Sequence, residues 1–301
     1  MKAVTVVESG VQIVDVDTPS PMDSEVLVKV HACGLNRADL VVADGGAHGA
    51  AGGPGTIVGM EFSGEIIKCG ETVKNLSIGD RVMCSGASVW AEYAIADYGR
   101  VIKIPDNNMD FATASTLPIA LATMHNAIVT IGNFSKGQTI LIQGASSGVG
   151  LMGLQIAKHL GAKLVIGTST KPEKFDKLKS IGADLVVNSK DKDWVDQVLQ
   201  ATNNEGVDLI IDQLSGYTIN ENMRASKVKG TIVNVGRLAG GNTEFNCDLH
   251  ALRRINYRGV TFRTRSINEI REVYSKMWSD LGDLVVKGKL SLPIEKIFEF
   301  D

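Results

Sequence analysis

The feature that most constrains this fold is a strand, a glycine-rich turn and a helix that follow one another in mid-chain. Residues 139–142 are apolar enough for a buried strand, and the turn at 144–150 carries almost no large side chains. Residues 151–160 repeat apolar side chains at helical spacing and stop at Gly161. Such a turn lets backbone N–H groups approach a pyrophosphate. The segment therefore predicts a dinucleotide site, although close packing of a helix on a sheet produces similar turns.

The pattern of expected secondary structure changes along the chain and divides it into two parts. Short strands and turns prevail up to about Pro105, with a glycine-rich loop over a site at 44–59. From about Phe111, strand-like and helix-like runs alternate, which indicates a doubly wound parallel sheet. The expected strands are 25–30, 61–67, one after the turn at 78–82, 139–142, 163–167, 185–187, 207–212 and 231–235. The expected helices are 151–160, 172–181, 194–201, 219–226 and 267–287.

The predicted class is therefore α/β, with two domains. A β-rich domain is expected at 1–110, completed by a return of the chain at 262–301, and a dinucleotide-binding domain is expected at 111–261. A chain of 301 residues with 44% hydrophobic and 22% charged residues can bury two such cores.

Charge and cysteine content exclude several classes of protein. A net charge of −3 makes no electrostatic case for nucleic acid or for an anionic membrane. The sequence has no leader-like start and no uninterrupted apolar run of about 18 residues. Its four cysteines are scattered, with no Cys-x-x-Cys pair, which predicts a reduced, cytoplasmic protein without disulfides.

A series of short motifs resembles the zinc-free quinone oxidoreductase branch of the medium-chain dehydrogenase/reductase superfamily, over essentially the whole chain. The motifs are Glu-Val-Leu-Val-Lys-Val at 25–30, Cys-Gly-Leu-Asn-Arg-Ala-Asp at 33–39, Gly-Met-Glu-Phe-Ser-Gly at 59–64, Ile-Gly-Asp-Arg-Val at 78–82, Leu-Pro at 117–118 with Thr123, the turn at 144–150, and Ile-Gly-Ala-Asp at 181–184. The resemblance implies a GroES-like catalytic domain, a Rossmann domain, an active site between them and a homodimer formed through the edge strand at 255–260.

The same resemblance implies two catalytic residues. Asn36 would lie beside nicotinamide and substrate, where its amide can donate to the acceptor oxygen, and Thr123 would hydrogen-bond near the nicotinamide. Asn36 also suits the N-cap of a helix that begins at Arg37, and the two roles are compatible. His125 is expected to pack rather than to act as an acid or base, so water would deliver the proton.

No metal site is expected. The zinc alcohol dehydrogenases of this superfamily carry a cysteine where Asn36 stands and a histidine where Met60 stands, and both are metal ligands there. A catalytic zinc ion needs three protein ligands, and Glu61 alone cannot hold it. Without a Lewis acid, hydride addition to a conjugated acceptor is favoured over reduction of an isolated carbonyl. The predicted substrates are quinones, enones and enals.

The expected cofactor is NADPH. An NAD site of this fold carries an Asp or Glu about 20 residues beyond the glycine turn, whereas here Ser169 and Lys174 follow the second strand. Both can bind a 2′-phosphate that a carboxylate would repel. A tyrosine common in the family after Gly-Ala-Asp is replaced by Val-Asn-Ser at 187–189. The predicted cofactor-binding residues are Ala145, Ser146, Ser147, Gly148, Val149 and Gly150 at the pyrophosphate, Ser169 and Lys174 at the 2′-phosphate, Asn188, and Gly236 with Arg237 at the nicotinamide half.

Three other classes of protein share some of these features. A short-chain dehydrogenase needs Tyr-x-x-x-Lys, and no tyrosine here has a lysine four residues later. A zinc alcohol dehydrogenase is disfavoured by Asn36 and Met60. An NADPH-binding sensor or structural protein without turnover stays open. The loop at 43–49 has no aromatic side chain to stack on a large quinone, which favours a smaller enone or enal, and the family usually continues past the strand expected at 290–300, whereas this sequence stops at Asp301.

Overall fold

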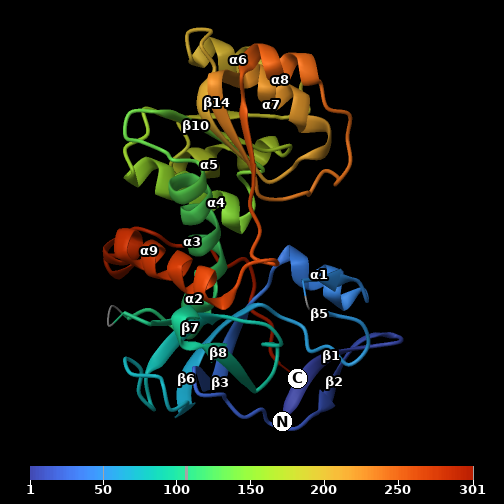
Figure 1. The fold of residues 1–301 in the computed structure, drawn as a ribbon, viewed down its shortest axis with the longest axis vertical. Coiled ribbons are helices and arrows are strands. Elements are labelled where there is room, and N and C mark those ends of the chain that lie inside the picture. Colours follow the sequence, from blue (N-terminus) through green and yellow to red (C-terminus); the bar gives the residue numbers. More distant parts are fainter. Residues whose placement is uncertain (50, 106–107, 301) are drawn as a thin grey trace. The chain divides into compact units, whose positions relative to one another are not determined.

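The structure is a computed structural model that describes residues 1–49, 51–105 and 108–300. Its contacts group the chain into two compact units, shown in Figure 1: residues 1–119 with 262–301, and residues 120–261. The sequence placed the first boundary at 110, before helix α2 (Phe111–Ser115). The structure keeps α2 with the first unit because it packs on strands β3, β6 and β7 of that unit.

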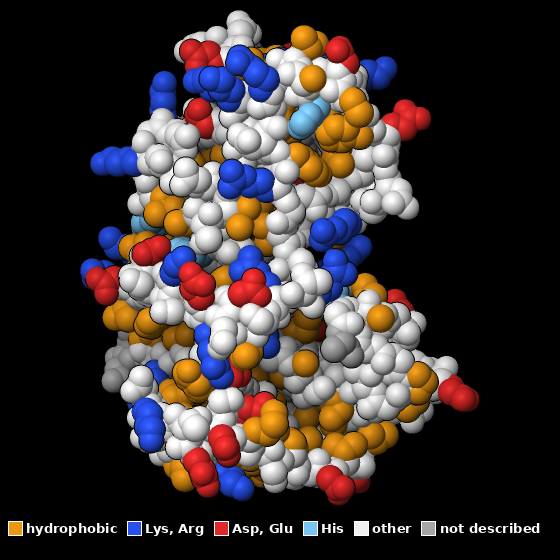
Figure 2. All heavy atoms as spheres, in the orientation of Figure 1, with side chains coloured by type: hydrophobic (Ala, Val, Ile, Leu, Met, Phe, Trp, Pro, Cys, Tyr) orange, Lys and Arg blue, Asp and Glu red, His pale blue; other side chains and the backbone are white. Residues whose placement is uncertain are grey.

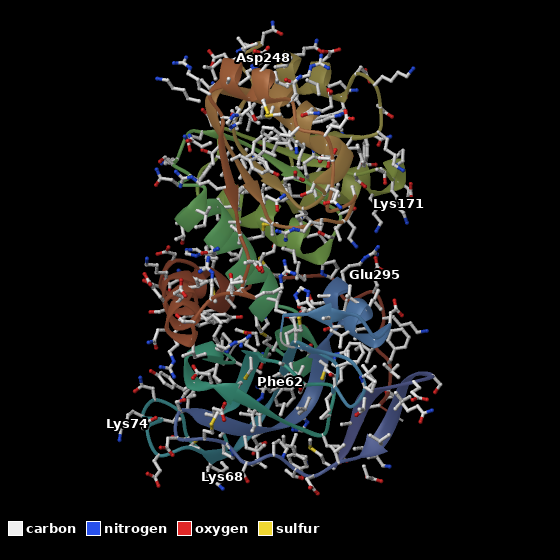
Figure 3. The ribbon with its side chains drawn as sticks, turned by 45° about the vertical axis from the view of Figure 1, so that its right-hand side comes forward. Phe62, Lys68, Lys74, Lys171, Asp248 and Glu295 are labelled. Carbon is white, nitrogen blue, oxygen red and sulfur yellow. The ribbon has the colours of Figure 1, made fainter. Side chains whose placement is uncertain are left out.

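An antiparallel sheet of five strands, in the order β8-β3-β6-β7-β9, forms the centre of the first unit. The strands are β3 (Glu25–Gly34), β6 (Glu61–Cys69), β7 (Arg81–Ser85), β8 (Tyr93–Asp97) and β9 (Val101–Lys103). The sheet contributes a cluster of fully buried side chains that includes Val26, Phe62, Ile66 and Val82. Figure 3 labels Phe62 inside this unit. The short helix α1 (Arg37–Ala43) follows β3 directly.

Smaller elements complete the first unit. Strands β1 (Lys2–Val7) and β2 (Gly10–Asp15) form a separate hairpin. Within the stretch expected to be a loop at 44–59, β4 (Ala47–His48) and β5 (Ala51–Gly52) pair with each other, while Ala50 lies outside the described residues. The long helix α9 (Ile267–Val286) returns to this unit, where Arg271 forms an ion pair with Asp97 at 2.6 Å.

The prediction of a strand at 290–300 is wrong, since none of these residues, all of which the structure describes, belongs to a strand. Their apolar residues alternate with polar ones in the manner of a strand, but a strand also requires a partner for its backbone hydrogen bonds. Ile297 and Phe298 remain 66% and 63% exposed. The C-terminal Asp301 lies outside the described residues.

The second unit confirms the predicted doubly wound parallel sheet. Its six parallel strands lie in the order β12-β11-β10-β13-β14-β15, which is the 3-2-1-4-5-6 order of dinucleotide-binding folds. The strands are β10 (Thr139–Gln143), β11 (Leu164–Thr168), β12 (Leu185–Val187), β13 (Val207–Asp212), β14 (Ser226–Asn234) and β15 (Asn256–Gly259). The helices are α4 (Gly148–His159), α5 (Phe175–Ile181), α6 (Trp194–Ala201), α7 (Ile219–Ala225) and α8 (Cys247–Arg253).

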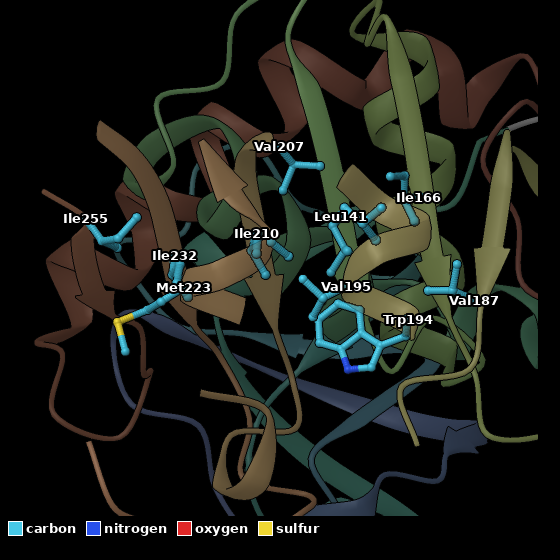
Figure 4. Close-up of a cluster of buried hydrophobic side chains, with 12 residues drawn as sticks. Leu141, Ile166, Val187, Trp194, Val195, Val207, Ile210, Met223, Ile232 and Ile255 are labelled. Carbon is cyan, nitrogen blue, oxygen red and sulfur yellow. The ribbon is translucent and has the colours of Figure 1, made fainter. Parts of the chain in front are cut away.

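A fully apolar core holds this sheet to its helices. Leu141, Ile166, Ile210 and Ile232 come from four neighbouring strands and pack with Trp194 of α6, as Figure 4 shows. Burial of each such side chain contributes about 1.5–3 kcal/mol relative to exposure. The core therefore fixes the strand register, and with it the place where every strand ends.

One helical stretch, Phe111–Ile131, is long and apolar enough to cross a membrane by length and composition alone, among the residues that the structure describes. It comprises α2, α3 (Pro118–His125) and a π-helical turn, η2 (Asn126–Ile131). Its most apolar window is 67% buried within the structure, as in the core helix of a globular protein. Over the face drawn in Figure 2, basic, acidic and apolar side chains are interspersed.

Candidate active site

The glycine-rich turn joins β10 to α4 at the carboxyl end of the central strand. Ser147 caps the helix, since its Oγ accepts a hydrogen bond from the Gly150 N–H at 3.0 Å. A Cβ on Gly150 would lie 2.6 Å from the carbonyl oxygen of Gly144, so only glycine allows this close approach. The turn therefore presents backbone rather than side chain, as a pyrophosphate site requires. The Ser147 hydroxyl itself is engaged with Gly144 and Gln213.

A buried polar network lies beneath this turn, and the sequence interpretation missed it. Gln143 donates to Asn222 at 2.6 Å, the Thr168 hydroxyl donates to Gln143 at 2.7 Å, and Asn222 donates to Asp212 at 3.1 Å. Asp212 also accepts from the Leu214 and Ser215 N–H groups, both at 2.9 Å. Burial raises the pKa of Asp212 against these bonds. The available signal was a polar residue at the end of three apolar strands: Gln143 of β10, Thr168 of β11 and Asp212 of β13.

The residues predicted for the 2′-phosphate both follow β11. Ser169 is 3% exposed, and its N–H donates to the carbonyl of Val187 at 3.1 Å, which holds the ends of β11 and β12 together. Lys174 is half-buried in the turn η3 (Pro172–Lys174), with which the predicted helix at 172–181 begins. Lys171, labelled in Figure 3, is exposed on the same turn.

Asn188 is already engaged within its own turn. Its Nδ2 donates to Asp191 at 2.7 Å, and its Oδ1 accepts from the Lys190 N–H at 3.1 Å. These bonds order the segment that connects β12 to α6. A direct contact between the Asn188 amide and a cofactor stays a prediction.

A tyrosine that the sequence interpretation did not single out stands beside this segment. Tyr217 lies in the turn η4 (Gly216–Thr218) after β13, and its hydroxyl is 3.5 Å from the Oγ of Ser189. Ser189 is 3% exposed, whereas Tyr217 is 48% exposed. A tyrosine from another strand end thus reaches the stretch at 187–189 that lacks one of its own. The two residues are 28 positions apart, so no local pattern could have revealed the contact.

Gly236 and Arg237 follow β14. A Cβ on Gly236 would lie 2.4 Å from the Gln213 carbonyl oxygen, so this position also requires glycine. Arg237 is exposed, and its guanidinium donates to the carbonyl of Val235 at 3.3 Å. Ser215 adopts φ +55°, a conformation that is costly for a residue with a side chain, and its hydroxyl donates to Gly236 at 2.8 Å. The backbone is therefore strained at Ser215, just beyond the end of β13.

Asn36 lies in the first unit, at the N-cap of α1. The Asp39 carboxylate accepts from its backbone N–H at 2.7 Å, and its side-chain Nδ2 donates to Oε1 of Glu61 at 2.8 Å. Asn36 is half-buried, whereas Asp39 and Glu61 are 1% and 4% exposed. Its position is that of a cap, but its amide is oriented by a buried carboxyl group.

Burial perturbs the ionisable groups around Asn36. It raises the pKa of Glu61 to about 7, with a smaller contribution from the charge of Asp39. It raises the pKa of Asp39 to about 6. Burial likewise raises the pKa of the Cys33 thiol to about 12, so this cysteine is an inert core residue, and it donates to the Val89 carbonyl at 3.2 Å. Glu61 and Asp39 are the functional candidates that sequence interpretation did not assign.

The predicted residue Thr123 belongs to the second unit, where it lies half-buried on α3. His125, two residues later, is 1% exposed, as a packing role requires. Among the described residues, no three His, Cys, Asp or Glu side chains are grouped so as to hold a metal ion. The amide of Asn36 and the thioether of Met60 are poor replacements for the missing zinc ligands, so this donor set does not fit zinc.

Comparisons with known proteins agree with this architecture. Residues 22–106 match the family model for the alcohol dehydrogenase GroES-like domain, and residues 148–279 match that for a zinc-binding dehydrogenase. A human quinone oxidoreductase is 29% identical over 308 residues, which cover 99% of this chain and 92% of the relative. A low-reducing polyketide synthase of Aspergillus calidoustus is 29% identical over 77% of this chain, but the match spans only 10% of that protein.

Solved structures show the same two-domain architecture. A mycobacterial protein in complex with NADPH superposes with a TM-score of 0.86 at 25% sequence identity, covering 98% of this chain and 91% of the other. The β-rich unit therefore corresponds to a GroES-like domain, and the parallel-sheet unit to a Rossmann-type domain.

Proposed function

Since the chain belongs to the medium-chain dehydrogenase/reductase superfamily and is related to its quinone oxidoreductases, we propose that it is an NADPH-dependent, zinc-independent reductase. Its substrates are quinones or, in preference, the activated C=C bond of small α,β-unsaturated carbonyl compounds. The observation that carries the proposal is Asn36, a hydrogen-bond donor oriented by a buried carboxyl group at a position where the zinc enzymes carry a metal ligand.

The second unit has residues that suit the cofactor. The turn from Ala145 to Gly150 would hold the pyrophosphate with its backbone N–H groups. Glycine at position 150 allows the helix to start this close to the strand, since a Cβ there would collide with the Gly144 carbonyl. Ser169 and Lys174 would bind the 2′-phosphate, and Tyr217, whose hydroxyl is 3.5 Å from Ser189, is a further candidate contact. Thr123, Gly236 and Arg237 would contact the nicotinamide half. When bound, a reduced nicotinamide supplies a hydride.

In the first unit, Asn36 donates a hydrogen bond to the acceptor oxygen on which negative charge develops. A conjugated acceptor spreads this charge, so a neutral amide suffices where an isolated carbonyl would need a metal ion. Water supplies the proton. The described residues of the stretch 43–49 carry no aromatic side chain, which suits a compact enal or enone better than a large quinone.

The test is turnover by purified protein with NADPH and a panel of enals, enones and quinones, after treatment with a chelator. Consumption of NADPH without metal supports the proposal. Turnover that appears only after zinc is added would overturn zinc independence. Tight binding of NADPH with no turnover of any acceptor would favour the second candidate, a cofactor-binding sensor or structural protein.

The proposed assembly is a homodimer. Strand β15 (Asn256–Gly259) ends the six-stranded sheet and is mostly exposed, so its outer backbone groups are available to a second copy. Light scattering on the eluting protein should give twice the chain mass of 32.1 kDa. A mass equal to one chain would refute this assembly.

A further inference from the structure

The carboxyl group of Glu61 is bonded to the carboxamide of Asn36 and has little freedom to move. Its Oε1 accepts from Asn36 Nδ2 at 2.8 Å, and its Oε2 accepts from the backbone N–H of Ile119 at 2.9 Å. The side chain is 4% exposed. Gly34 presses against it so closely that a Cβ there would lie 2.6 Å from Oε1. The carboxyl group is therefore held on both oxygens and enclosed by backbone.

The two partners of Glu61 differ in what they can do. The Ile119 N–H is a fixed donor, so Oε2 must accept from it whether Glu61 is ionised or protonated. A proton taken up by Glu61 then resides on Oε1, which faces Asn36. The new O–H group is itself a donor, and its partner within reach on Asn36 is the carboxamide oxygen Oδ1. The carboxamide pairs with this donor when it turns over and presents its Oδ1 to Glu61.

We propose that Glu61 is the positioning residue for Asn36, and that protonation of Glu61 turns the Nδ2 group of Asn36 away from it, which frees both N–H groups for the acceptor oxygen. The inference rests on the proposed function, in which that oxygen is reduced beside Asn36. When Glu61 is ionised, one N–H group of the Asn36 amide donates to the carboxylate and is not available to the substrate. The negative charge of Glu61 then also lies close to the acceptor oxygen, on which negative charge must develop.

The surrounding groups place this change near neutral pH. Asp39 of α1, Cys33 of β3 and Tyr274 of α9 interact electrostatically with Glu61. Arg100 interacts with Tyr274, and both are bonded to the hydroxyl of Ser85. Burial raises the pKa of Tyr274 to about 12, as it does that of Cys33, so both stay neutral. Asp39, with a pKa of about 6, ionises slightly before Glu61, with a pKa of about 7, and disfavours its ionisation.

The decisive variant is Glu61→Gln. Its amide oxygen can keep the Ile119 bond while its NH₂ group donates to Asn36 Oδ1, which imitates protonated Glu61 at every pH. In the unaltered enzyme, kcat for an enone should fall roughly fivefold or more between about pH 5.5 and 8.5, with a midpoint near 7. In Glu61→Gln, kcat should stay near the acidic plateau across that range, and the KM for NADPH should not change. A variant profile that falls as the unaltered one does would overturn the proposal.

A second readout does not depend on turnover. The side-chain NH₂ resonance of Asn36, assigned by its loss in Asn36→Ala, should titrate in the cofactor-free protein with the same midpoint and should not titrate in Glu61→Gln. Asp39→Asn removes the charge that raises the pKa of Glu61 and should lower the midpoint. That variant keeps the test available if Glu61→Gln does not fold. A resonance that ignores pH in the unaltered protein, or an unshifted midpoint in Asp39→Asn, would refute the positioning role. Failure to reduce any acceptor, with the titration present, would instead refute the proposed function alone.

Discussion

The two polar clusters of this protein surround their buried carboxyl groups with different numbers of hydrogen-bond donors and different neighbouring charges. Beneath the glycine-rich turn, the single carboxylate Asp212 accepts from two backbone N–H groups and from Asn222, and its other neighbours are neutral amides and hydroxyls. Around Asn36, two buried carboxyl groups lie close together, and Oδ1 of Asp39 has no hydrogen-bond partner among the described residues. The single carboxylate of the first cluster therefore has more donors than Asp39 of the second, and it has no second carboxylate beside it.

This difference indicates a division of labour. A satisfied network in a low-dielectric interior is rigid and holds strand ends in place for a ligand. A buried carboxyl group beside a second one instead takes up a proton near neutral pH, because burial and the neighbouring charge both disfavour its ionised form. We therefore expect the cluster beneath the turn to act as a scaffold and the Asn36 cluster to change its protonation state near neutral pH. Each of the following experiments tests one side of this contrast.

The largest expected effect concerns Asn36. Replacing it with alanine removes a donor to the oxygen that gains charge, so kcat/KM for an enone should fall by about 10²–10³. The affinity for NADPH, measured by fluorescence titration, should be retained. Leu35→Ala, at the neighbouring residue that is 64% exposed, is the matched control. An equal loss in both variants would mean that the segment, rather than the amide, matters.

The next effect is on stability. The pKa of Glu61 rises from 4.5 to about 7 on folding, so the folded protein binds this proton more tightly than the unfolded chain. The resulting stabilisation is complete below about pH 4.5, is lost as the pH rises through about 7, and amounts to about 3 kcal/mol. Denaturant melts from pH 5 to 8 should therefore show the stability of Glu61→Gln rising relative to the unaltered protein. Glu65→Gln, an exposed charge on the same strand, is the control. Parallel pH profiles for Glu61→Gln and the unaltered protein would contradict the assignment.

The cluster beneath the glycine-rich turn should behave differently. Gln143→Leu leaves the Thr168 hydroxyl and the Asn222 carbonyl oxygen without their partner, which should cost about 2 kcal/mol. Because the lost groups are neutral, this cost should be the same at pH 5 and pH 8. Urea melts followed by the fluorescence of Trp194, in the core of that unit, measure it. A cost that varies with pH would remove the contrast between the two clusters.

The smallest effect distinguishes the two nicotinamide cofactors. Lys174→Ala should raise the KM for NADPH about tenfold, because a charge-assisted contact to the 2′-phosphate is lost, and should leave the KM for NADH unchanged. Lys171→Ala, on the same turn, is the matched control. Tyr217→Phe should weaken NADPH binding by less than Lys174→Ala does. Equal changes for both cofactors would place Lys174 outside the phosphate site.

Much of the fold followed from local patterns. The helix Trp194–Ala201 and the strand Val207–Asp212 have their predicted limits, because apolar periodicity and flanking polar residues act within a few positions. The strand, turn and helix at 139–160 were equally readable, since the sterics of Gly150 are local. The strand at 290–300 failed because the pattern of one segment carries no information about a pairing partner.

The sequence by itself determined where the nucleotide fold begins and which residues form its glycine-rich turn. That Asn36 stands where zinc enzymes carry a ligand stays an inference from family resemblance. Only the tertiary structure decided that Glu61, 25 residues from Asn36, orients its amide, and that Tyr217 reaches Ser189. Backbone preferences are set by neighbours along the chain. Hydrogen-bond partners and buried charges are set by which strands lie side by side, and that depends on packing across the whole unit.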